Sequence, residues 1–135
     1  MNCRRVLIGF AAALTMVISG CYVQRQNNSA SIRELLDHLV ASGIPVESVQ
    51  MTDADIVGAR EAVAVKFRDN PREIGIYRYD LKRTDDCKKM DFAVENGFIY
   101  IHGSKYPVLV NGSFMILGYE KNTLKHELIA AMDTF

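Results

Sequence analysis

Apolar residues three and four residues apart, the spacing of an amphipathic helix, begin directly after Ser31. Ser31 and Glu34 form a capping box, in which each side chain accepts a hydrogen bond from the other residue's backbone N–H. Gly43 can adopt the left-handed conformation that ends a helix, and Pro45 prevents its continuation. We therefore expect a helix with one buried face. Its residues are Ile32, Leu35, Leu36, Leu39 and Val40.

Two later segments carry similar helical signals. Thr84 is expected to cap a second helix, because Asp85 and Asp86 follow in the first turn, where carboxylates favour the positive end of the helix dipole. Gly97 is expected to end this helix. A last helix should begin near residues 122–123. The inward-facing residues are Cys87, Met90 and Val94 on the second helix and Leu124, Leu128, Ile129, Met132 and Phe135 on the last.

Alternating apolar and polar residues predict strands between these helices. The alternation is clearest over 62–68, where Val63, Val65 and Phe67 share one face. Asn111-Gly112 lies between two apolar runs and predicts a tight hairpin, since both residues tolerate positive φ. The other candidate strands are 73–80, 98–102, 107–110 and 113–119, with residues 46–51 as a further one and residues 52–58 as a turn or short helix.

These segments predict an α+β fold. The hairpins favour a mostly antiparallel, twisted sheet of about five strands, with the amphipathic helices packed on one face. Residues 31–135 are long enough for one domain with a core and too short for two. Residues 22–30 are polar and are expected to form a flexible tether in front of it.

The first twenty-one residues form a different kind of segment. Arg4 and Arg5 precede a thirteen-residue run, 6–18, that contains no charge. This is the order of a secretory signal peptide. At about 1.5 Å per residue, a helix of this length is too short to span a hydrocarbon core of about 30 Å.

The end of this segment, Ile18-Ser19-Gly20-Cys21, resembles the lipobox of bacterial lipoprotein signal peptides. The resemblance implies that the Cys21 thiol is joined to a diacylglycerol and that the chain is cut between Gly20 and Cys21. Two or three acyl chains then anchor the protein stably. An aspartate after the cysteine tends to retain such proteins in the inner membrane. Tyr22 stands at that position, so the resemblance favours the outer membrane if the organism has one. An ordinary secretory signal followed by an unrelated cysteine is the alternative.

Charge and cysteine content limit the partners that we expect. The sequence has 16 basic and 16 acidic residues, and removal of Arg4 and Arg5 leaves 14 and 16, a net charge of −2. This balance gives no general attraction to nucleic acid. Cys3 would leave with the leader and Cys21 would be acylated. The mature protein would then keep Cys87 alone, so we expect no disulfide within it, and a buried structural role for Cys87.

We expect no metal site, no cofactor and no catalytic set in this sequence. The three histidines, His38, His102 and His126, lack the spacing of zinc ligands. A small enzyme with a site assembled from distant residues, such as Cys87, His102 and Asp80, stays open as an alternative.

Tyr77, Arg78 and Tyr79 form a candidate interaction face, because tyrosine and arginine are common at interface hot spots. Tyrosines lying under a helix are the other interpretation of the same residues. The sequence thus predicts a lipid-anchored envelope protein that acts as a non-catalytic binding or structural module. Its partners would be the membrane, through Cys21, and an envelope protein or small ligand. An inhibitor or immunity-type lipoprotein is a further alternative.

Overall fold

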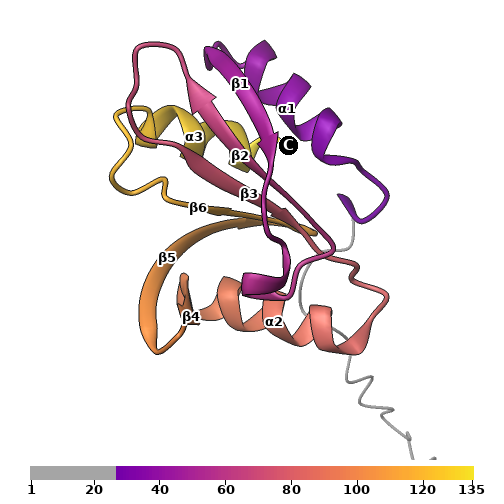
Figure 1. Cartoon of the computed structure of the whole chain (residues 1–135). Helices are drawn as coiled ribbons and strands as arrows, with labels where there is room; N and C mark the ends of the chain where they lie inside the picture. The colour runs from indigo at the N-terminus through magenta and orange to yellow at the C-terminus, as the bar shows by residue number, and fades with distance from the viewer. Residues whose placement is uncertain (1–26) are drawn as a thin grey trace, which may run out of the picture.

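The computed structural model describes residues 27–135, which form three α-helices, one short 3₁₀ helix and a six-stranded sheet (Figure 1). The predicted α+β class is confirmed, with six strands in place of about five. The elements are α1 (Ile32–Ala41), β1 (Val46–Met51), η2 (Asp55–Val57), β2 (Glu61–Phe67), β3 (Ile74–Arg78), α2 (Thr84–Asn96), β4 (Phe98–Ile101), β5 (Ser104–Asn111), β6 (Phe114–Leu117) and α3 (Lys125–Asp133).

The sheet has the strand order β1-β2-β3-β6-β5-β4, and every neighbouring pair is antiparallel. Two three-stranded meanders, β1–β3 and β4–β6, meet where β3 pairs with β6. Because β3 and β6 pair with each other, β1 and β4 are the edge strands, and α2 connects the two meanders along the chain.

Helices α1 and α3 cover one face of the sheet. The capping box of Ser31 and Glu34 is present at the start of α1, as predicted. Gly43 has a φ of +87° just after the helix, which confirms its predicted role. The core on this face contains Leu35 and Leu39 of α1, Val65 and Phe67 of β2, Ile74 and Ile76 of β3, Phe114 and Ile116 of β6, and Leu128 and Met132 of α3.

Helix α2 packs on the opposite face, which corrects the expectation that the helices share one face. Side chains alternate along β6, so that Phe114 and Ile116 join the core under α1 and α3 while Met115 and Leu117 join a second one. Met90 and Ala93 supply the α2 side of this second core. The periodicity of a single helix shows which of its faces is buried but does not show which face of the sheet it covers.

The ends of several elements differ from the prediction. Thr84 is the first residue of α2 and gives no side-chain cap, and Val94 is 55% exposed. Strand β5 begins at Ser104, because His102 and Gly103 both have positive φ and complete the turn in two residues. The predicted hairpin forms between β5 and β6, but its turn is one residue later than predicted. Asn111 pairs with Phe114, so the two turn residues are 112–113.

The domain includes part of the predicted tether. The Asn27 side chain donates to that of Asn111 at 2.7 Å, and the Ser113 hydroxyl donates to the Asn27 carbonyl. The Leu81 N–H donates to Asn28 Oδ1 at 2.6 Å. The folded part therefore includes Asn27, and the six strands and both cores described above lie within residues 27–135. No helix within this range is long and apolar enough to cross a membrane. The leader, with its lipobox, lies outside the described residues.

Candidate functional site

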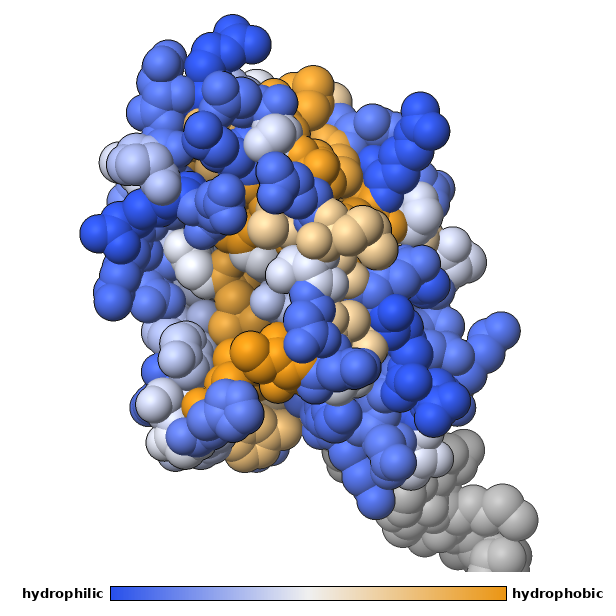
Figure 2. Space-filling model, viewed as in Figure 1, coloured by the Kyte–Doolittle hydropathy of each residue, from blue (hydrophilic) through white to orange (hydrophobic). Residues whose placement is uncertain are grey.

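An apolar groove of about 400 Å³ lies where η2, α2 and β4 approach one another. We call it the α2 groove. Figure 2, which has the view of Figure 1, shows hydrophobic surface on the lower part of this face, around the position of η2. The residues that line the groove are Ile56, Val57, Tyr79, Lys88, Lys89, Phe92, Ile99, Tyr100 and Met115.

Local backbone contacts place η2 at the rim of the groove. The Asp53 carboxylate accepts from the Asp55 N–H at 2.8 Å, and Gly58 ends the turn with a φ of +64°. Beneath it, Tyr79 is buried and its hydroxyl donates to the Val57 carbonyl at 3.1 Å. Burial raises the pKa of Tyr79 far above its ordinary value, so the phenol stays a neutral donor. The tyrosine thereby fixes η2 to the sheet.

Large apolar side chains remain open to solvent at the groove. Ile56 is 49% exposed, Phe92 41% and Tyr100 61%. Phe92 and Tyr100 each meet the ring of Phe98 edge to face, at 5.9 and 5.4 Å between centroids. Apolar side chains gathered in this way at a concave surface are typical of binding sites.

Two lysines give the groove its charge. Lys88 and Lys89 lie on the exposed side of α2, one helical turn before Phe92. The Lys89 ammonium lies 3.5 Å from the Gly58 carbonyl, and it would have to move if position 58 carried a side chain. Among the described residues that line the groove there is no carboxylate. The lining of the groove therefore carries two positive charges and no negative one.

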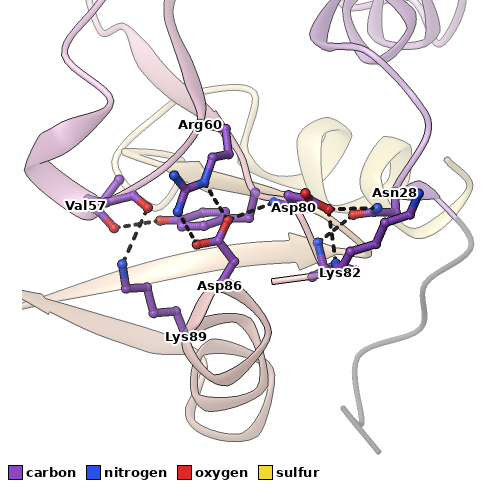
Figure 3. Close-up of polar contacts among 10 residues, drawn as sticks. Asn28, Val57, Arg60, Asp80, Lys82, Asp86 and Lys89 are labelled. Carbon is purple, nitrogen blue, oxygen red and sulfur yellow. Dashed lines mark hydrogen bonds and ion pairs between the residues drawn. The ribbon is translucent and has the colours of Figure 1, made fainter. Parts of the chain in front are cut away.

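A buried ion pair holds α2 against the residues that follow η2 (Figure 3). Asp86 is fully buried and accepts from Arg60 Nε at 2.8 Å and Nη2 at 2.7 Å. It also accepts from the Asp80 N–H at 2.9 Å. Hydrogen bonds from Arg60 are the largest cause that lowers the pKa of Asp86, so the carboxylate is ionised at neutral pH. This contact positions α2 and with it the wall of the groove.

The predicted face of Tyr77, Arg78 and Tyr79 is not formed. Tyr79 is 1% exposed and lies in the core under α2, as the alternative interpretation proposed. Arg78 points to the other face of the sheet, where it pairs with Glu61 at 2.8 Å. Tyr77 lies over Gly75 and is half-buried. Alternation along a strand sends successive residues to opposite faces, which separates Arg78 from both tyrosines.

Cys87, His102 and Asp80, the residues proposed for an enzyme site, are not arranged as a catalytic set. Cys87 is buried, as expected, and its sulfur is part of a disulfide bond in this unprocessed chain. The expectation of no disulfide concerned the mature, acylated protein and stays a prediction. A disulfide sulfur is not a thiolate nucleophile. The Asp80 carboxylate accepts from Asn28 and from the Lys82 N–H. His102 is exposed in the β4–β5 turn.

Within residues 27–135, no group of three or more His, Cys, Asp or Glu side chains is placed to hold a metal ion. Every buried side-chain nitrogen and oxygen in this part of the chain has a hydrogen-bond partner. The predicted lipidation and cleavage positions, Cys21 and Gly20, lie before the described residues.

Sequence reasoning did not find the α2 groove, because its walls come from three separate segments. The available signal was Phe92, an aromatic residue outside the apolar stripe of its helix. No protein-family model matches the chain, and neither curated proteins nor solved structures show significant similarity to it.

Proposed function

We propose that this protein is a lipid-anchored binding protein of the bacterial envelope and that the α2 groove is its binding site. The α2 groove is the observation that supports the binding role. Exposed aromatic and aliphatic side chains surround a groove of about 400 Å³, which is within the size range of small-ligand sites. The lipobox at residues 18–21 supports the anchor.

A short connection would hold the domain close to the membrane. Only residues 22–26 lie between Cys21 and Asn27, and six Cα-to-Cα steps span at most about 20 Å. Asn27 contacts the β5–β6 turn, and Asn28 contacts the segment before α2. We therefore expect this end of the sheet to face the bilayer.

A disulfide at Cys87 and acylation at Cys21 require different forms of the chain. The sequence offers only Cys3 and Cys21 as partners within the chain. Cleavage before Cys21 removes Cys3, and a thioether to diacylglycerol occupies the sulfur of Cys21. A chain with an internal disulfide and a mature, acylated chain are thus mutually exclusive forms. We propose that the acylated form is the functional one.

The binding role is tested by photo-crosslinking in cells. A benzophenone amino acid replaces Tyr100 in the groove and, as the control, Val40, which is 56% exposed on α1. After irradiation, the intact mass of each purified chain is measured. We expect a mass adduct with the Tyr100 variant and none with the Val40 variant. Equal adducts, or none at either position, would contradict the assignment of the site.

A further inference from the structure

The distribution of charge in the α2 groove indicates what kind of molecule it would take. Lys88 and Lys89 stand on the α2 wall, and Phe92 follows them one turn later, about 5 Å along the helix axis. Figure 3 shows Lys89 extended from α2 toward Val57. The other walls are apolar, with Ile56 on η2 and Ile99 and Tyr100 on β4.

Both lysines keep hydrogen-bonding capacity for a ligand. Lys88 is exposed, and Lys89 makes only one long contact, 3.5 Å, to the Gly58 carbonyl although an ammonium has three donors. No carboxylate among the described residues lines the groove, and the Asp86 carboxylate, which acts on Lys89 from the start of α2, is already paired with Arg60, so an anion in the groove would meet two positive charges at its wall. A cationic head would be repelled by these residues, and an uncharged head would form weaker hydrogen bonds with them than an anionic one.

We infer that the α2 groove binds a single-chain amphiphile with an anionic head, such as a fatty-acid carboxylate or an alkyl phosphate. The head contacts Lys88 and Lys89, and the alkyl chain lies against Phe92, Ile99 and Tyr100. This inference rests on the proposed binding role and adds the class of ligand to it. Burial of the alkyl chain supplies most of the affinity, and the lysines favour an anionic head over an uncharged or cationic one.

The test is a calorimetric titration of a protein that begins at residue 22 and lacks the leader. This protein keeps the six described strands and both cores, which lie within residues 27–135. Dodecanoate, dodecyl phosphate and dodecanol are the probes, each below the concentration at which it aggregates. We expect one dodecanoate per chain with a dissociation constant tighter than about 1 mM. Higher salt should weaken this binding, because the contacts with the head are exposed.

Two pairs of variants distinguish contacts with the anionic head of the ligand from contacts with its alkyl chain. The double variant Lys88→Ala/Lys89→Ala should weaken dodecanoate about fivefold and leave dodecanol unchanged. Its control is Lys121→Ala/Lys125→Ala, which removes the same charge near α3. Phe92→Ala should weaken both probes, whereas Val94→Ala, on the same helix and outside the groove, should weaken neither. Circular dichroism confirms that each variant is folded.

The inference is overturned if dodecanoate does not bind, or if the control variants weaken it as much as the groove variants do. A flotation assay with phosphatidylglycerol vesicles separates a free amphiphile from a lipid surface. Vesicle binding that needs Lys88 and Lys89, without binding of dodecanoate, would replace the ligand with the membrane and overturn the inference. In either case, an adduct at position 100 in cells would leave the binding role intact and reject only the ligand class.

Discussion

The ion pair between Arg60 and Asp86 gives the strongest single prediction about stability. Asp86→Asn keeps the size of the side chain but removes its charge. One amide oxygen can accept from only part of the three N–H groups that the carboxylate now satisfies, and the amide nitrogen is itself a donor. The variant therefore loses charged hydrogen bonds to a side chain that has no access to solvent.

The expected loss follows from the burial of the two partners. Removing one member of a buried ion pair costs about 3–5 kcal/mol of unfolding free energy. The Arg60 side chain is 38% exposed and can turn to water, which places the loss near the lower end, about 3 kcal/mol. For a domain of this size, that corresponds to a decrease of roughly 12 °C in melting temperature.

Asp85→Asn is the matched control. Asp85 also lies in the first turn of α2, so this substitution removes the same favourable charge from the positive end of the helix, but its side chain is exposed. We expect it to cost no more than about 0.5 kcal/mol. The chain has no tryptophan, so urea unfolding is followed by circular dichroism. Equal losses for the two variants, within about 0.5 kcal/mol, would refute the claim that the buried pair holds α2 in place.

Three further predictions concern the rest of the domain. The stabilisation that Asp86 contributes is fully present above the ordinary carboxyl pKa of 3.8 and is lost as the pH falls through the lowered pKa of Asp86 in the folded protein. The urea midpoints at pH 7 and pH 3 should therefore differ less in Asp86→Asn than in the wild type. Asn122 is buried and makes hydrogen bonds to Asn70, Arg72 and Leu124, so Asn122→Ala should lower the unfolding free energy by about 2–4 kcal/mol; a loss below about 0.5 kcal/mol would contradict this. Leu39→Ala, in the core under α1, should lose about 2–5 kcal/mol in the same urea titration, and Val40→Ala, on the exposed side of α1, less than about 1.

Local patterns in the sequence were sufficient to predict most of the elements. The capping box of Ser31 and Glu34 and the left-handed Gly43 involve residues close in sequence, and both were found as expected. The α+β class also followed, because alternating runs joined by short turns must pair as antiparallel strands.

Contacts between distant segments could not be predicted in the same way. Helix α2 covers the face opposite α1 and α3, a choice that its own periodicity leaves open. Asp86 was expected to serve the helix dipole, whereas its carboxylate pairs with Arg60, 26 residues earlier. The α2 groove likewise joins η2, α2 and β4, and no spacing along the chain brings them together. The sequence motif at residues 18–21 is local, which is why it supports a proposal about the anchor without any help from the fold.

The lipid anchor is tested by the intact mass of the protein purified from membranes. We expect a chain that begins at Cys21 and carries two or three acyl chains, and a Cys21→Ala variant that lacks this mass and leaves the membrane fraction. A wild-type chain without acyl groups would contradict this expectation, above all one in which tryptic peptides show Cys21 joined to Cys87 by a disulfide.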